Sequence, residues 1–289
     1  MSIQQRIGVV GGGTMGVGIA YVFALAGCET TVVEPDDERA RSLRKTIEDT
    51  AQAGARRGKL DAQQARSLPD AVRRIAAIAD LPPRLDLVVE TVPERLELKR
   101  RVLAEIEAGQ PSIIASNTSA LSIDELAGPL RDPASFLGMH FFNPVWSLPM
   151  VELVRGARTS EATLARAREF AAAIGKETIT VRDVPGFATS RLDLIASLEA
   201  MRMLQDGVAS AEDIDKAMLI AYRHPMGPLR LSDIVGLDVR LDIARNLAVK
   251  LGERYAPPRI LEEKVARGEL GRKTGRGFFD WPDASPAKP

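Results

Sequence analysis

Residues 6–16 of the chain, RIGVVGGGTMG, decide the fold of its first half. The stretch begins with a short β-branched run and ends in glycines spaced as G-x-G-x-x-G. Apolar, helix-like residues follow over 14–26 and stop at Gly27, and a second β-branched run lies at 29–34. A strand, a glycine turn, a helix and a second strand in so short a stretch predict a βαβ unit of the dinucleotide-binding type.

Three of the four glycines of this turn have different predicted roles. Gly11 permits the tight turn, Gly13 lets a pyrophosphate approach the backbone, and Gly16 lets the helix pack closely on the strand. Thr14 and Met15 open the helix, whose free N–H groups and positive dipole end face the phosphates. A purely structural glycine turn is the alternative, and the strand-turn-helix context argues against it.

Glu34, at the end of the second strand, is predicted to select the cofactor. Its carboxylate can accept hydrogen bonds from the adenosine ribose hydroxyls. A 2′-phosphate would also face Asp36, Asp37 and Glu38, so we expect NAD rather than NADP. Those three acids are themselves best interpreted as residues of a helix N-terminus, where negative charge is favoured.

The remaining pattern of the first half alternates strands with helices. Strand-length apolar runs lie around 72–79 and at 85–90, 112–116, 136–142 and 177–181, with helical patterns at 94–108 and 161–174. Continuous apolar runs suit strands that are covered on both faces, so the sequence predicts an α/β, Rossmann-like, doubly wound and mostly parallel sheet. The polar stretch 36–58 is too long for a simple crossover, and we expect part of this helix or helix pair to project from the domain.

The pattern changes at Asp183, where DVPG begins. Beyond it we find no strand-length β-branched run with turn signals, and residues 187–206 carry apolar side chains at nearly helical spacing. We therefore expect an NAD-binding domain over 1–183 and a smaller all-α C-terminal domain over 184–289.

The composition is that of a folded protein with no excess of either charge. The chain has 289 residues, 45% of them hydrophobic, which is enough for two domains with separate cores. Lys plus Arg and Asp plus Glu are equal at 39 each, so we expect no nucleic-acid partner, and we expect no metal ion. No apolar run reaches membrane length and no signal-peptide pattern opens the chain, so we expect a cytoplasmic protein with no membrane partner. The single cysteine, Cys28, is interpreted as a small core residue.

Two polar residues lie in apolar stretches of the sequence, and each is a suitable hydrogen-bond partner for the other. His140 stands at the end of a predicted strand, in GMHFFNP, and Glu152 is an acid inside the apolar run MVELV. Imidazole is suited to take a hydroxyl proton near neutral pH, and a buried carboxylate requires a partner. We therefore predict that Glu152 fixes the tautomer of His140 and stabilises its imidazolium. A lone strand histidine is also often a satisfied core residue, and His224, before a proline at a turn, is interpreted as structural.

Residues 116–119, SNTS, follow another predicted strand. Short polar side chains beyond the carboxyl end of a strand lie where open α/β sheets bind ligands. A turn or helix cap is the alternative, and Ser122 with Glu125 has the spacing of a capping box. That cap leaves Asn117 and Ser119 unexplained, so both are candidate site residues.

Taken together, the motifs resemble the short-chain L-3-hydroxyacyl-CoA dehydrogenase family, especially its bacterial 3-hydroxybutyryl-CoA members. The motifs that occur in the family's order along essentially the whole chain are GGGTMG, ETVPE, SNTS, GMHFFNP, VEL, DVPGF, EDID, HPMGP, GLD and GRKTGRGFF. The resemblance implies an NAD-dependent oxidoreductase of fatty acid metabolism, of the beta-oxidation type, that converts an L-3-hydroxyacyl-CoA reversibly to the 3-oxoacyl-CoA. It also implies a homodimer formed through the C-terminal domain, which closes over the substrate.

The resemblance assigns roles to individual residues. His140 falls on the family's catalytic base and Glu152 on its partner acid. Ser119 falls on the hydroxyl that contacts the substrate oxygen, and Asn117 lies beside it near the nicotinamide. Glu34 falls on the ribose-binding acid.

Further implied contacts concern the cofactor and CoA. Glu94 and Lys99 fall on residues that contact the cofactor. The projecting polar stretch resembles a helical excursion that helps to hold CoA, with Arg56, Arg57 and Lys59 suited to its phosphates.

One position departs from the family pattern. After PGF the family usually has an Asn before the Arg, in contact with the substrate carbonyl and the catalytic histidine, whereas this chain has Ser190 in PGFATSR. A serine hydroxyl can still donate one hydrogen bond, but its reach is shorter. This departure puts the polarising role of Ser190 and the substrate range in doubt.

Two alternative functions remain open at this point. One is an NAD-dependent dehydrogenase of a free hydroxy acid, of the gulonate or carnitine type, which shares the architecture. The other is a non-catalytic, crystallin-like NAD-binding protein. The intact pair of His140 and Glu152 argues against the second, and an NADH absorbance assay distinguishes them.

Overall fold

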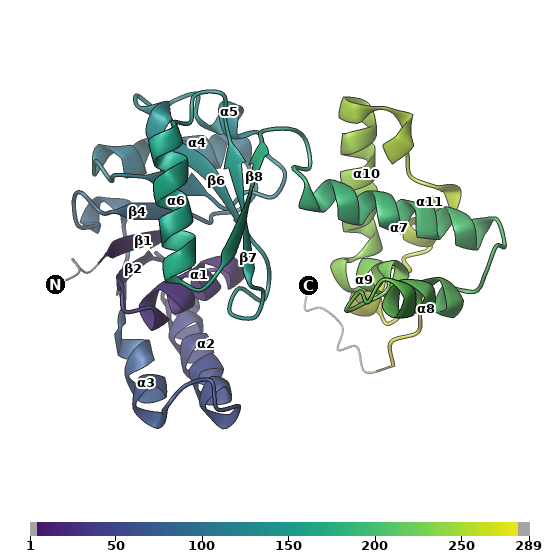
Figure 1. Ribbon diagram of the computed structural model, residues 1–289, viewed down its shortest axis with the longest axis horizontal. Helices are drawn as coiled ribbons and strands as arrows, with labels where there is room; N and C mark the ends of the chain where they lie inside the picture. Colours follow the sequence, from purple (N-terminus) through teal and green to yellow (C-terminus); the bar gives the residue numbers. More distant parts are fainter. Residues whose placement is uncertain (1–4, 283–289) are drawn as a thin grey trace. The chain divides into compact units, whose positions relative to one another are not determined.

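The computed structural model describes residues 5–282 and divides the chain into two compact units, Met1–Phe187 and Ala188–Pro289. The first unit is a sheet covered by helices, and the second consists of helices (Figure 1). Each unit has hydrophobic clusters of its own.

The first three elements form the predicted βαβ unit. β1 (Arg6–Val10) leads through the glycines into α1 (Thr14–Leu25), and β2 (Glu29–Val33) pairs parallel with β1. Gly27 adopts a positive φ of 82° after the helix, which lets the chain turn back toward the sheet. Cys28 is buried there, as predicted.

Eight strands form one sheet in the order β3-β2-β1-β4-β5-β6-β7-β8. The remaining strands are β3 (Val72–Ile75), β4 (Leu87–Glu90), β5 (Ile114–Ser116), β6 (Phe136–Phe141), β7 (Met150–Arg155) and β8 (Glu177–Arg182). The strands from β3 to β6 pair in parallel, β7 runs antiparallel to β6, and β8 is parallel to β7. The structure confirms the predicted doubly wound, mostly parallel sheet, whose switch point lies between β1 and β4.

Helices cover both faces of this sheet (Figure 1). One core includes α1, α2 (Asp37–Arg56) and α6 (Glu161–Ala173), and the other includes α4 (Leu96–Ala108) and α5 (Ile123–Leu126). Every residue of β4 and β6 is buried, because both sides of the sheet are covered.

The polar segment after β2 is a helix pair longer than the predicted 36–58. α2 is followed by α3 (Ala62–Ser67), which Asp61 caps, and the two helices extend together from the sheet in Figure 1. α2 buries few side chains, since most of its surface faces solvent. Short 3-10 turns lie at Leu68–Asp70, Ile78–Asp80, Pro133–Ser135, Glu253–Tyr255 and Arg272–Thr274.

Two predicted boundaries are wrong in detail. The apolar run around 72–79 is a strand only over β3, because the chain then leaves the sheet through Ala76 and Ala77 to line a cavity. The helix predicted at 94–108 begins at Leu96. Glu94 stays outside it because its carboxylate accepts backbone N–H groups of a neighbouring loop.

The described part of the second unit contains helices and no strand, as predicted, with two isolated β-bridges near its end. Its helices are α7 (Thr189–Gln205), α8 (Ala211–Ala221), α9 (Pro228–Val235), α10 (Leu237–Leu251) and α11 (Arg259–Ala266). Asp233, fully buried on α9, accepts hydrogen bonds from the N–H groups of Phe278 and Phe279 and from the indole of Trp281, which fastens the C-terminal segment. No helix within residues 5–282 is long and apolar enough to cross a membrane.

Candidate functional site

Of the four glycines in the turn between β1 and α1, only Gly13 has open space around it. Gly11 has a φ of +109°, and a Cβ on Gly16 would lie 1.8 Å from the Gly11 carbonyl oxygen. Gly16 therefore allows α1 to pack closely on the turn that follows β1. A Cβ on Gly13 would meet nothing within 4 Å. Because the first turn of α1 contains no acid, the N–H groups at its start are suited to an anion at this open face.

Glu34 lies directly after β2 and is almost completely buried. Its carboxylate accepts the N–H groups of Gly12 and Asp36, each at 3.0 Å, and Nε of Arg39 lies 3.7 Å away. A Cβ on Gly12 would come within 2.9 Å of the Glu34 side chain. The middle glycine of the turn, to which the sequence analysis gave no role, thus has to be glycine because the acid approaches it.

A cavity of about 570 Å³ joins the glycine turn to this acid. Its lining comes from the glycine turn, Glu34, Arg39, Ala76–Ile78, Thr91–Pro93, Leu98, Val102 and Glu105. The cavity is therefore mostly apolar, with a carboxylate at one wall and free helix N–H groups at another. Such a lining suits an adenosine whose ribose carries free hydroxyls.

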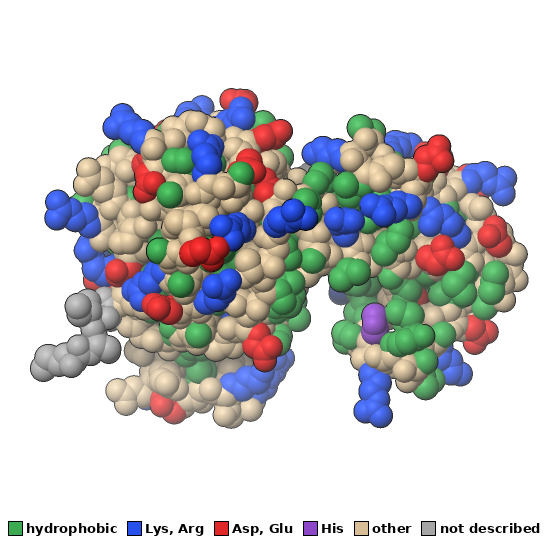
Figure 2. All heavy atoms as spheres, turned by 45° about the horizontal axis from the view of Figure 1, so that its top comes forward, with side chains coloured by type: hydrophobic (Ala, Val, Ile, Leu, Met, Phe, Trp, Pro, Cys, Tyr) green, Lys and Arg blue, Asp and Glu red, His purple; other side chains and the backbone are tan. Residues whose placement is uncertain are grey.

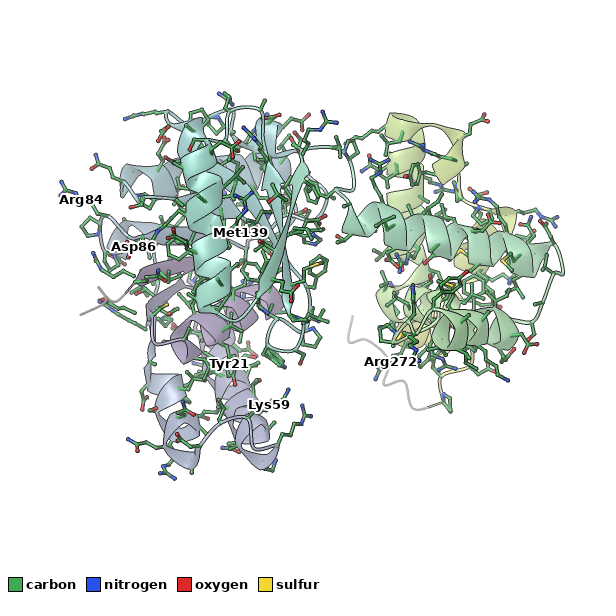
Figure 3. The ribbon with its side chains drawn as sticks, in the orientation of Figure 1. Tyr21, Lys59, Arg84, Asp86, Met139 and Arg272 are labelled. Atoms are coloured by element: carbon green, nitrogen blue, oxygen red, sulfur yellow. The ribbon has the colours of Figure 1, made fainter. Side chains whose placement is uncertain are left out.

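His140 and Glu152 are cross-strand partners. The register of β6 and β7 places them directly opposite each other, and His140 Nδ1 lies 2.9 Å from Glu152 Oε2. Both side chains are buried, and His140 directly follows the buried Met139, which Figure 3 labels. The rings of Phe142 and Phe187 lie 4.4 and 6.0 Å from the imidazole. Because the carboxylate engages Nδ1, that nitrogen carries the proton of the neutral ring and Nε2 is the basic one.

A second cavity of about 300 Å³ brings the predicted residues together. It is lined by Met15, Thr91, Val92, Glu94, Lys99, Asn117, Ser119, His140 and Phe141. The Asn117 carbonyl oxygen accepts the N–H of Phe141 at 2.9 Å, which leaves the amide NH₂ for another partner. Ser119 is exposed, and its N–H donates to Glu94 at 3.0 Å. We refer to this cavity as the reaction pocket.

Glu94 and Lys99 belong to a charge network at the reaction pocket, in which Lys99 is buried and Glu94 is partly exposed. Lys99 Nζ lies 3.2 Å from Glu94 and 2.8 Å from Glu90, at the end of β4. Thr118 also donates to Glu94 through its hydroxyl. Sequence reasoning missed Glu90, although an acid that closes the apolar run LVVE resembles the signal that identified Glu152.

The basic cluster at the end of α2 borders a third cavity, of about 310 Å³. Arg57 and Lys59 line it together with Tyr21 and Trp146, whereas Arg56 is exposed and is not among the lining residues. Figure 3 labels Tyr21 on α1 and Lys59 beyond α2. The cavity has an aromatic wall and a basic rim.

Three other residues are not among the lining residues of these cavities. Ser190 is in the first turn of α7, in the second unit, and His224 is exposed between α8 and α9. Ser122 does cap α5 by accepting the N–H of Glu125, but the reciprocal bond of the predicted capping box is absent from the described contacts. The Ser122 hydroxyl instead donates to Asp183.

Comparison with known proteins identifies the family. The model of the 3-hydroxyacyl-CoA dehydrogenase NAD-binding domain matches residues 6–184, and the model of the C-terminal domain of the same family matches residues 186–281. The chain belongs to the 3-hydroxyacyl-CoA dehydrogenase family. The first unit is thus the family's NAD-binding domain, and the protein is an NAD-dependent oxidoreductase.

Alignments with relatives and with solved structures span almost the whole length of this dehydrogenase. It is 40% identical over 282 residues to a 3-hydroxybutyryl-CoA dehydrogenase of Mycobacterium tuberculosis, covering 96% of this chain and 98% of that protein. A relative of the same description from Bradyrhizobium diazoefficiens is 39% identical, covering 99% and 98%. The crystal structure of (S)-3-hydroxybutyryl-CoA dehydrogenase from Ralstonia eutropha superposes with a TM-score of 0.91 at 36% identity, covering 97% and 100%.

The dehydrogenase has residues that fit NAD. Among the glycines of the turn, Gly13 leaves open space beside an acid-free helix start, as a pyrophosphate requires. Glu34 directly follows β2 and holds its carboxylate against the turn, as a ribose diol requires.

Proposed function

We propose that the protein catalyses the reversible oxidation of a short-chain L-3-hydroxyacyl-CoA, such as 3-hydroxybutyryl-CoA, to the 3-oxoacyl-CoA. The observation that carries this proposal is the buried pair of His140 and Glu152 at the wall of a pocket that also contains Asn117 and Ser119. The names of the similar proteins from M. tuberculosis, B. diazoefficiens and R. eutropha support the choice of acyl group.

His140 is the proposed base. In the oxidation, Nε2 takes the proton of the substrate 3-hydroxyl, and Nδ1–H keeps its hydrogen bond to Glu152. The resulting imidazolium lies beside a buried carboxylate, which stabilises its charge and holds the ring in one orientation. When bound, NAD supplies the acceptor for the hydride that leaves carbon 3. In the reverse direction, His140 returns the proton as an acid.

Neighbouring polar groups are proposed to hold the substrate oxygen and the cofactor. Ser119 donates a hydrogen bond from its hydroxyl to the substrate 3-oxygen. The side-chain NH₂ of Asn117 is available beside that oxygen, because the side-chain carbonyl of Asn117 already accepts the N–H of Phe141 on β6. Glu94 and Lys99 line the same pocket and contact the nicotinamide half of the cofactor. Ser190 enters the proposal through the family resemblance alone.

The glycine turn and Glu34 are proposed to hold the other half of the cofactor. Gly11, Gly13, Thr14, Met15 and Gly16 surround the pyrophosphate. Glu34 binds the ribose hydroxyls and disfavours NADP, because a buried carboxylate repels a 2′-phosphate.

CoA is proposed to lie along the cavity beside α2. The exposed Arg57 and Lys59 carry the positive charge that its phosphates require, and Tyr21 and Trp146 supply an aromatic wall for its adenine. Arg56 does not line this cavity, so it serves as a control for Arg57 and Lys59. We further propose a cytoplasmic homodimer whose interface lies in the C-terminal unit.

A panel of acyl-CoA substrates tests the proposal. Formation of NADH from L-3-hydroxybutyryl-CoA, followed by absorbance, should be rapid, and it should be much slower with NADP. Activity with free hydroxy acids but not with CoA esters would contradict the assigned substrate class. Equal or better catalytic efficiency with NADP would contradict the assignment of Glu34 to the ribose.

A further inference from the structure

Glu90 is a fully buried acid at the carboxyl end of β4 that the mechanism above does not use. Its oxygens accept from Lys99 Nζ at 2.8 and 3.0 Å, from the Val92 N–H at 2.6 Å and from the Ser116 hydroxyl at 2.6 Å. These neighbours all act as donors, which is the bonding pattern of an ionised carboxylate. Burial raises the pKa of Glu90, and the Lys99 ammonium opposes that shift.

The charges of this network do not balance. Lys99 is buried between two carboxylates, Glu90 and the partly exposed Glu94, and its remaining contact is the carbonyl oxygen of Val92. Glu94 also accepts hydrogen bonds from backbone N–H groups of the loop after β5, and these groups are neutral dipoles. Two carboxylates and one ammonium therefore leave one negative charge in excess.

This excess charge lies at the wall of the reaction pocket. Glu94 and Lys99 both line the pocket, and Glu90 lies directly behind them. In the sheet, Glu90 is level with Val10 of β1 and Ser116 of β5, next to the switch point at which open α/β sheets bind their ligands. Glu90 and Lys99 are both buried in this wall, so water screens their charges poorly.

We propose that Glu90 is a charge-setting and positioning residue that biases the pocket toward the oxidised cofactor. NAD⁺ carries a positive charge on its nicotinamide ring, whereas the ring of NADH is neutral, and the two cofactors are otherwise alike. One excess negative charge beside the ring therefore strengthens the binding of NAD⁺ relative to NADH. The inference rests on the proposed function, which puts the nicotinamide half in this pocket.

The ratio of the two dissociation constants isolates this effect. We would measure the Kd of NAD⁺ and of NADH by titration calorimetry for the full-length protein and for Glu90→Gln. The substitution keeps the shape of the side chain and removes its charge, so the ratio Kd(NAD⁺)/Kd(NADH) should rise by about tenfold, the order expected for one unit charge near the ring. Glu97→Gln is the matched control, because Glu97 is a largely exposed acid on the same helix as Lys99, and it should leave the ratio unchanged.

A double substitution separates charge from positioning. Glu90→Gln with Lys99→Met removes one negative and one positive charge, so the excess charge is the same as in the unmodified protein although the network is lost. The ratio should return close to its original value. An unchanged ratio in Glu90→Gln, or a shift that persists in the double variant, would overturn the proposal.

A second variant tests the proposal if Glu90→Gln fails to fold. If thermal melting shows that Glu90→Gln does not fold, Glu94→Gln removes the other acid of the network from a partly exposed position. It must raise the ratio in the same direction, and no change would overturn the proposal. Failure of the unmodified protein to bind either form of the cofactor would instead contradict the proposed function.

Discussion

At the scale of single residues, the site depends on polar side chains that hydrogen-bond to each other across the sheet. His140 and Glu152 lie twelve positions apart in the sequence but directly opposite each other in the sheet. Antiparallel pairing places opposite residues on the same face, so two side chains that are isolated in the sequence form a hydrogen bond. Neither residue would perform its proposed task alone, because the imidazole needs orientation and the buried acid needs a donor.

The proposed unit of His140 and Glu152 predicts non-additive kinetics. His140→Ala should lower kcat by roughly 10²–10⁴-fold, as is typical of a general acid–base group. Glu152→Gln keeps the shape and removes the charge, so it should lower kcat as well. The double variant should be little worse than the worse single variant, because residues that act as one unit are not additive.

The affinity for NAD, measured by calorimetry, is the control for these variants and should change little. If the two losses multiply in the double variant, the residues act independently. If His140→Ala turns over at a nearly normal rate, the assignment of the base is wrong.

Substitution of two glycines of the turn is predicted to have different effects on stability. Gly16→Ala would push a Cβ to within 1.8 Å of a carbonyl oxygen, so it should lower both the melting temperature and the affinity for NAD. Gly13→Ala has open space and a φ of −74°, so the melting temperature should stay the same. Its methyl group would occupy the face through which the pyrophosphate approaches, so only the affinity for NAD should fall. A loss of thermal stability in Gly13→Ala would contradict this interpretation of the turn.

At the scale of elements, the functional cavities begin where strands and helices end. β3 stops at Ile75, and the apolar residues that follow line the proposed adenosine cavity instead of the core. α4 begins two residues after Glu94, because that carboxylate binds the loop containing Ser119. The helix pair α2 and α3 extends from the sheet and carries the basic rim of the proposed CoA cavity.

The end of α2 predicts a selective effect on CoA binding. Arg57→Gln with Lys59→Gln should raise KM for the acyl-CoA by roughly tenfold, since exposed charge pairs contribute up to about 1 kcal/mol each. Arg56→Gln is the matched control, because Arg56 is exposed on the same helix but does not line the cavity. The Kd of NAD should be the same in all variants. An equal rise of KM in the control would mean that the general positive charge of the segment, and not the cavity, attracts CoA.

The segment after α11 predicts a pH-dependent contribution to stability. Hydrogen bonds from Arg267 and Lys264 lower the pKa of Glu269 from 4.5 to about 2. A carboxyl group whose pKa is lower in the folded state stabilises the fold above its unfolded pKa and loses that contribution as the pH falls toward its folded pKa. The urea midpoint of the protein should therefore exceed that of Glu269→Gln at neutral pH, and the difference should vanish between about pH 4.5 and 2.

Glu253→Gln, at an exposed glutamate of the same unit, is the control for this pH series. A difference between Glu269→Gln and the unmodified protein that stays constant down to pH 2 would show that the ion pairs with Arg267 and Lys264 contribute nothing measurable.

At the scale of the whole molecule, the two units expose very different surfaces. Among the described residues, large hydrophobic side chains of the first unit are at most 39% exposed, whereas several in the second unit are more than 60% exposed. Those residues are Leu192, Val208, Ile220, Tyr222 and Val249. Figure 2 shows hydrophobic side chains, in green, grouped on the surface of the second unit. Exposed apolar patches of this kind mark interaction sites, which supports the proposed homodimer.

Light scattering tests this prediction. The protein should have at least twice the mass of one chain at micromolar concentration. Ile220→Asp with Tyr222→Asp should shift the equilibrium toward the monomer without unfolding the unit, because both side chains are more than two-thirds exposed. A stable monomer of the unmodified protein would refute the homodimer.

The sequence by itself determined the βαβ unit, the doubly wound sheet and the helical second half. It did so because glycine spacing, β-branched runs and helical periodicity are local properties of neighbouring residues. It also singled out His140 and Glu152, since a polar residue in an apolar run is visible without a structure.

Only the tertiary structure decided how these residues meet. The sequence could not show that Glu90 pairs with Lys99, that Gly12 must accommodate Glu34, or which cations at the end of α2 face a cavity. Each of these contacts joins elements whose relative position depends on strand order, register and helix packing. Those features are fixed by the packing of the whole unit and leave no local mark in the sequence.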